Sequence, residues 1–239
     1  ATFGTTESAL EQAPDGGYKL VTRFAKFVNT PELSLMVRQV MDVVSSKDLD
    51  KYVTRPALKG GQRNLVVVDP SPDLKDYQKQ LGERMRAIEK RKGPVKKGDD
   101  ILLSVINDGR LAAIDMRLVD PSASDNGSKL DRMIQNIYRR WKDGADTPFY
   151  GVKPEGGYTD QPIMRGPSTQ MVFSTLGLNP TKHNPSFAVH RFIRAQLVAM
   201  GVPADEIILS ENLTSDARKQ RAFNDMNEGK KRILIGSKT

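Results

Sequence analysis

From residue 171 onward, short apolar runs alternate with amphipathic stretches, and this alternation limits the folds open to the chain. Residues 171–175 (MVFST), 206–210 (EIILS) and 233–236 (ILIG) are apolar runs of strand length. Longer stretches with helical spacing of apolar residues separate them. Strands that are apolar on both faces and alternate with amphipathic helices are typical of a parallel sheet covered on both sides, with right-handed crossovers. We therefore expect an α/β fold.

The two helices between these strands have recognisable ends. We expect the first to carry Pro185 in its first turn and to stop at Gly201. The second should begin after Ser215, whose hydroxyl can cap it, and stop at Gly229. The apolar positions expected to pack on the sheet are Val189, Ile193, Leu197, Met200, Ala222, Phe223 and Met226.

Residues 1–150 read as mostly helical. Helices are expected to begin at Thr30, at Ser71 and at Ser128, the last with Asp131 completing a capping pair. Residues 102–106 predict a short helix that is interrupted at residues 107–109 (NDG). The Gly- and Pro-rich residues 144–168 predict a flexible loop or insertion.

Taken in order, these segments resemble the second RecA-like lobe of superfamily 2 helicases, most closely the Swi/Snf-type DNA translocases. Residues 171–175 match the motif IV strand, Arg218 and Phe223 match an Arg and a Phe spaced five apart, and residues 233–236 match the strand that opens motif V. Residues 52–81 are similar to the linker strand and helix that lead into this lobe. The sequence of the C-terminal tail is also similar to that of large phage or mobile-element polypeptides that join such a motor to a methyltransferase or antirestriction module.

The resemblance implies a division of the chain. Residues 1–50 are expected to be a helical segment, residues 51–127 a linker strand and helical region, and residues 128–239 an incomplete second RecA-like lobe. The rest of motif V and motif VI, with its arginine finger, would lie beyond Thr239. The chain then reads as a fragment of a DNA-dependent ATPase, with ATP and Mg²⁺ bound in the full-length parent and the first motor lobe of the same polypeptide as partner.

The same resemblance supplies candidate binding residues for the phosphates of non-specific duplex DNA. They are Ser174, Thr175, Arg218, Ser237, Lys238 and Thr239. Those at strand ends would lie at the carboxyl edge of the sheet, where ligands of open α/β folds bind. Ser and Thr also cap strand ends, and Arg218 can organise its own helix, so both interpretations stay open. No Gly-x-x-x-x-Gly-Lys-Ser/Thr loop is present, so we expect neither catalytic residues nor ATP hydrolysis by this chain alone.

Composition agrees with a polyanion-binding protein. The 37 basic residues exceed the 29 acidic ones, giving a net charge of +8. With no cysteine and two histidines, there is little material for a thiolate, zinc or triad site. No signal-peptide order and no apolar run of about 18 residues is visible, so we expect a cytoplasmic protein without a membrane partner. The alternative function is a basic α/β module that binds nucleic acid or protein without any motor. A nucleotide-sugar or cofactor enzyme is disfavoured, because no acid/base cluster or dinucleotide glycine fingerprint occurs.

Overall fold

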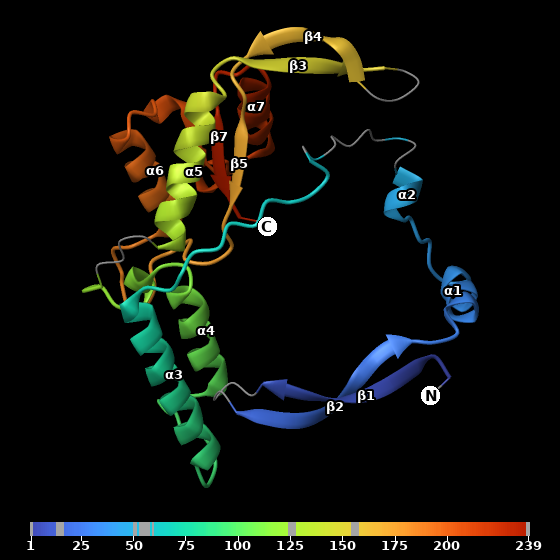
Figure 1. The fold of residues 1–239 in the computed structure, drawn as a ribbon, viewed down its shortest axis with the longest axis vertical. Helices are drawn as coiled ribbons and strands as arrows, with labels where there is room; N and C mark the ends of the chain where they lie inside the picture. Colours follow the sequence, from blue (N-terminus) through green and yellow to red (C-terminus); the bar gives the residue numbers. More distant parts are fainter. Residues whose placement is uncertain are drawn as a thin grey trace. The chain divides into compact units, whose positions relative to one another are not determined.

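The computed structural model describes residues 2–12, 17–49, 52, 58, 60–123, 128–153 and 158–237 (Figure 1). The chain divides into two compact units, Ala1–Val66 and Val67–Thr239. None of the helices in the described ranges combines the length and apolar character needed to cross a membrane.

The first unit opens with a β-hairpin, so the expectation of a helical segment at residues 1–50 is wrong for residues 4–27. Strands β1 (Gly4–Gln12) and β2 (Tyr18–Phe27) pair antiparallel, with Leu10 opposite Leu20. The physical reason is the content of aromatic and β-branched residues in β2 (YKLVTRFAKF), which favours a strand. Helices α1 (Thr30–Arg38) and α2 (Ser46–Leu49) follow, and α1 begins at Thr30 as predicted. No described side chain of this unit is buried.

The predicted linker strand is not found where the chain is described. Residues 60–71 contain no strand, and Leu65 and Val67 are 87% and 77% exposed. An extended segment becomes a strand only when a neighbour satisfies its backbone groups, and these residues have no such pairing. Residues 51, 53–57 and 59 of the same prediction lie outside the described residues.

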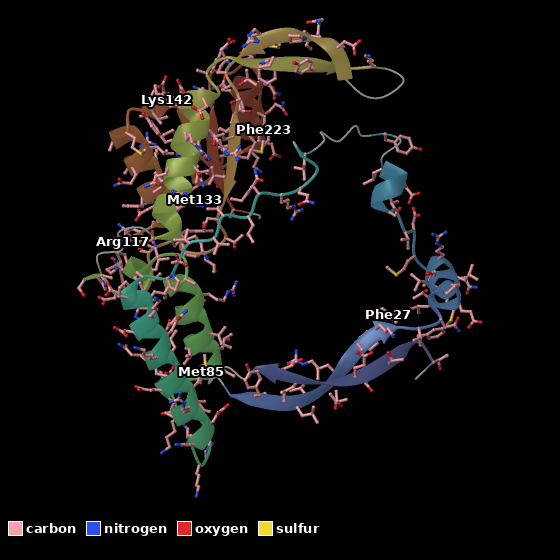
Figure 2. The ribbon with its side chains drawn as sticks, viewed as in Figure 1. Phe27, Met85, Arg117, Met133, Lys142 and Phe223 are labelled. Carbon is pink, nitrogen blue, oxygen red and sulfur yellow. The ribbon has the colours of Figure 1, made fainter. Side chains whose placement is uncertain are left out.

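The second unit begins with two packed helices, α3 (Pro72–Lys90) and α4 (Leu102–Ala112). Ser71 caps α3 as predicted, with its hydroxyl accepting from the Leu74 N–H at 3.2 Å. Leu81 and Met85 of α3 bury against Val105 of α4, and Figure 2 labels Met85 at this contact.

Helix α4 continues through residues 107–109, so the predicted interruption there is wrong. Asp108 is buried where it meets Arg84 of α3, and a Cβ at Gly109 would lie 3.2 Å from the Leu81 side chain. Tertiary contacts to α3 therefore outweigh the weak helix propensity of Asn, Asp and Gly.

Helix α5 (Lys129–Asp143) begins with the predicted capping box, in which Ser128 and Asp131 each bond the other's backbone. Strands β3 (Thr147–Val152) and β4 (Tyr158–Gly166) then form an antiparallel hairpin, with Thr147 opposite Gly166. The prediction of a loop at residues 144–168 is therefore wrong for residues 147–152 and 158–166, while residues 154–157 lie outside the described residues. The base of the hairpin is closed by the Ser168 N–H, which donates to the Gly144 carbonyl at 2.8 Å.

The predicted parallel sheet is present. Strands β5 (Gln170–Phe173), β6 (Ile207–Leu209) and β7 (Ile233–Gly236) run parallel in the order β5-β7-β6. The chain passes from β5 beyond β7 to β6 and then returns to β7. Right-handed crossovers in opposite directions place their helices on opposite faces of the sheet. Figure 1 shows this, with α6 (Val189–Ala199) beside α5 on one side and α7 (Asp216–Asn227) on the other.

The main core lies between the sheet and the α5–α6 layer. Three predicted positions of α6 are 0% exposed, namely Val189, Ile193 and Leu197. The predicted helix ends are also found, because α6 and α7 stop before Gly201 and Gly229, which both have positive φ. Two predicted core positions are wrong, because Met200 is 36% and Phe223 is 41% exposed. The core residues from the sheet are Val172, Ile207, Leu209, Ile233 and Ile235.

Pro185 does not lie in the first turn of α6, which begins at Val189. The preceding loop is anchored on the 3-10 turn η1 (Met116–Leu118), where the Thr181 hydroxyl donates to the Leu118 carbonyl at 2.7 Å. The Asn184 amide donates to the Arg117 carbonyl at 2.9 Å. These side-chain bonds hold residues 181–186 in a non-helical path.

Candidate functional site

The two ends of the parallel sheet differ in how their polar groups are satisfied. At the amino end, Arg232 is 6% exposed and donates to the Trp141 carbonyl at 2.5 Å. The Trp141 indole N–H donates to the Glu206 carboxylate at 2.6 Å. Burial lowers the pKa of Arg232. Because these groups satisfy one another, the amino end is a structural closure.

The carboxyl end brings two of the predicted residues together. The Ser174 N–H donates to the Gly236 carbonyl at 2.9 Å, which places Ser174 beside Ser237, the residue after Gly236. The Ser174 hydroxyl donates to the Leu176 carbonyl at 3.1 Å. Thr175 follows with an exposed side chain. Strand ends of this kind present hydroxyls and amides at one edge, although their role in binding stays a prediction.

Arg218 lies in the first turn of α7, and its guanidinium donates to the Thr214 hydroxyl at 3.1 Å. The Arg218 backbone N–H also donates to the Ser215 hydroxyl, which caps the helix, at 3.4 Å. These bonds fit the interpretation that Arg218 organises the start of its helix. Lys238 and Thr239, the remaining predicted residues, lie outside the described residues.

A pocket of 560 Å³ opens at this carboxyl end, on the side of the sheet that carries α7. Along β5, Val172 points into the core, whereas Met171 and Phe173 lie on the opposite face and are 57% and 61% exposed. Figure 2 labels Phe223, which α7 contributes to the same pocket. The apolar lining consists of Met171, Phe173, Leu178, Leu213, Phe223 and Leu234.

The polar lining of the pocket comes from several elements. His190 lies in the first turn of α6 and is 4% exposed, with its Nε2 donating to the Ser174 carbonyl at 3.3 Å. Burial lowers the pKa of His190, so the neutral imidazole is favoured. The Glu211 carboxylate accepts from Arg191 at 3.2 Å. The polar residues at the pocket are Asn179, His190, Ser210, Glu211, Lys219 and Ser237.

Gly236 leaves room for a close approach where β7 ends. A Cβ at this position would lie 3.1 Å from both the Cβ and the Oγ of Ser210. Glycine therefore allows the residue after β6 to approach the end of β7, and the Ser210 and Ser237 side chains reach one pocket.

Sequence reasoning missed His190, Ser210 and Lys219 as lining residues. Ser210 could have been predicted from the sequence, because it follows an apolar run in the same way that Ser174 and Ser237 do. His190 and Lys219 depend on how α6 and α7 are rotated against the sheet, which no local pattern specifies. Among the described residues, no group of three or more His, Cys, Asp or Glu side chains is placed to hold a metal ion.

Comparisons with known proteins add nothing to these observations on the site. No family model, curated protein or solved structure matches the chain.

The basic residues near the end of α3 are partly structural. Arg84 donates to Asp100 at 2.6 Å and 3.0 Å and to Asp108 at 3.0 Å. Arg91 donates to the Asp100 carbonyl at 2.9 Å. The neighbouring guanidinium of Arg84 lowers the pKa of Asp100. These two arginines therefore belong to the α3–α4 packing and are not available as phosphate contacts.

Proposed function

We propose that Val67–Thr239 is the DNA-gripping part of a helicase-type translocase, with the second RecA-like lobe as its architecture. The carboxyl edge of the β5–β7–β6 sheet holds backbone phosphates of duplex DNA without regard to sequence. The partner is the first motor lobe of the same polypeptide, with ATP and Mg²⁺ bound in the assembled parent. This chain alone does not hydrolyse ATP, and it works in the cytoplasm.

The observation that carries the proposal is the parallel order β5-β7-β6 together with what stands at its carboxyl end. Ser237 follows Gly236 there, and Thr175 has an exposed side chain. Ser174, whose N–H and hydroxyl donate to the Gly236 and Leu176 carbonyls, holds the strand ends in place. Backbone amides and small hydroxyls are donors that bind phosphate oxygens without reading base sequence. The opposite end of the sheet is closed by Arg232, Trp141 and Glu206, so it supports the carboxyl end as the side for a ligand.

Net charge supports the choice of a polyanion. A chain with a charge of +8 attracts DNA, and binding through phosphates weakens with salt as counterions return. We therefore expect weak binding to duplex DNA of arbitrary sequence, falling at least about tenfold between 50 and 200 mM salt.

The test uses a fluorescein-labelled duplex and the whole chain, with binding followed by anisotropy. Ser237→Glu places a carboxylate at the edge, where it repels phosphates, and should weaken binding by about tenfold. Gln135→Glu is the matched control, because it makes the same charge change at an exposed position on α5. Released phosphate is measured alongside, and none above background is expected.

The two possible functions give different results. An equal loss in both variants would mean diffuse attraction to a basic surface, and the chain would then be a simple binding module. Salt-insensitive binding, no binding, or ATP turnover by the purified chain would each contradict the proposal.

A further inference from the structure

The pocket on the α7 side has a composition that phosphate binding at the sheet edge does not explain. Two phenyl rings, from Phe173 and Phe223, line it and stay 61% and 41% exposed. A solvated sheet face ordinarily carries polar residues at such positions. Phe173 cannot join the main core, because Val172 next to it already points there. These rings therefore present an apolar, aromatic surface to whatever enters the pocket.

Polar groups converge on the same space. The Ser210 and Ser237 side chains come from the ends of two strands, and the Asn179 amide comes from the loop after β5. The neutral His190 ring and the Lys219 ammonium complete the set. A concave site of 560 Å³ with an apolar wall and a few convergent polar groups is typical of small-ligand sites, whereas a protein-docking face is flatter.

We propose that this pocket binds a nucleobase, with the ring stacked on Phe173 and Phe223 and its polar edge bonded to the Ser210, Ser237 and Asn179 side chains. A nucleobase is flat and aromatic and has donors and acceptors on its rim, which matches both parts of the lining. The charges at the pocket are paired, Lys219 with Asp216 at 3.1 Å and Glu211 with Arg191 at 3.2 Å, so a neutral ring suits it better than an anion alone. The base comes either from a free nucleoside or from an unstacked position in a single strand.

This inference does not depend on the motor function. In duplex DNA the bases are stacked and paired, so the phenyl rings have no part in gripping duplex phosphates. Changes at Phe173 and Phe223 should therefore leave duplex binding unaltered, and the two proposals can fail separately.

The experiment titrates the whole chain with adenosine, thymidine, a ten-nucleotide single strand and an abasic strand of the same length. Binding is followed by ligand-observed NMR for the nucleosides and by anisotropy for the strands. Phe173→Ala and Phe223→Ala should each weaken base binding by about tenfold, the size of one base–aromatic stack. Phe27→Ala is the control, because Phe27 is 62% exposed and lies in the first unit.

The arms separate the two sources. Nucleoside binding as tight as that of the strand identifies a free ligand, while binding of the normal strand but not the abasic one identifies an unstacked base. If no probe binds, or if the two phenylalanine variants bind every probe as well as the unaltered chain, the proposal is wrong. Loss of self-association in those variants without any nucleoside binding would instead make this face a protein contact, and would also overturn it.

Discussion

His190 is a titratable residue that lines the pocket and is also buried. Its ring is 4% exposed, and its Nε2 donates to the carbonyl of Ser174 at the strand end. Burial lowers its pKa, so protonation in the folded chain is unfavourable. Acid therefore acts on this site by favouring states in which the ring reaches water.

The sign of the pH dependence follows from linkage. An unfolded histidine has a pKa of about 6.5, and the folded value of His190 is lower. The unfolded chain then binds more protons as the pH falls below about 7. The stability that the neutral ring contributes is fully present above that pH. It is lost as the pH falls through the folded pKa of His190. The urea midpoint, followed by circular dichroism, should be lower at pH 5.5 than at pH 7.5, and His190→Gln should reduce this difference.

His183→Gln is the control, since the chain has only these two histidines. A difference between the two pH values that survives unchanged in His190→Gln would show that another group is responsible.

Local chemistry predicted residues whose partners are close in sequence. The capping pair of Ser128 and Asp131 is confirmed because both bonds stay within one helical turn. Pro185 was wrongly placed because the loop before α6 is held by Asn184 and by Thr181 bonding to η1, far away in sequence. No pattern around Pro185 contains that information.

At the scale of elements, Asp108 joins three parts of the second unit. Its carboxylate on α4 accepts from Arg84 on α3 at 3.0 Å and lies 3.3 Å from His183, in the segment between β5 and α6. The Asp108 side chain is 3% exposed and the Arg84 side chain 33%. Asp108 therefore ties the helical pair to the loop that leads away from β5.

We expect Asp108→Asn to lower the free energy of unfolding by about 2 kcal/mol. Breaking a fully buried pair costs roughly 3–5 kcal/mol, and the partial exposure of Arg84 reduces that figure. Asp160→Asn is the matched control, because Asp160 pairs with Lys153 while 89% exposed, and should cost about 0.5 kcal/mol or less. Urea denaturation of both variants measures this. Equal costs would mean that the Asp108 cluster does not hold the elements together.

Elements with a strong local period were predicted, and those defined by pairing were not. The start of α3 at Ser71 and the runs that became β5, β6 and β7 needed only capping residues, spacing and composition. The β3–β4 hairpin was missed because its sequence is rich in Gly and Pro, which are typical of loops. Its pairing, such as that of Phe149 with Met164, is set by strand register. The β1–β2 hairpin was missed because its pairing, such as Leu10 with Leu20, is likewise set by register.

At the scale of the whole chain, the two units differ in how much core they have. The second unit holds every buried apolar side chain among the described residues, beginning with Leu81. The first has a two-stranded hairpin and two short helices without a buried side chain, and an isolated hairpin is marginal on its own. Stability of the second unit should therefore come from its own contacts.

The protein shortened to Val67–Thr239 should fold alone. Its urea midpoint should equal that of the whole chain within about 10%, because none of the described residues that are removed is buried. Limited proteolysis of the whole chain should leave a stable product close to this range, identified by mass spectrometry. A shortened protein that is insoluble, or that unfolds at clearly lower urea, would contradict the division.

The α/β class was predictable from the alternation after residue 171, whereas the layout of the first unit was not. Parallel strands buried on both faces leave an apolar run in the sequence, as in β7. The described residues of the first unit's hairpin include no buried side chain, so they show no contrast between an inner and an outer face.

The closure at the amino end of the sheet has a practical consequence for spectroscopy. Trp141 is the single tryptophan of the chain, and its indole is fixed to Glu206 at the end away from the pocket. Its fluorescence emission should shift when the fold opens, yet change little when a ligand occupies the far end. Tryptophan fluorescence would then report denaturation but hardly change when a ligand fills the pocket. A titration without a fluorescence change would therefore not count as absence of binding.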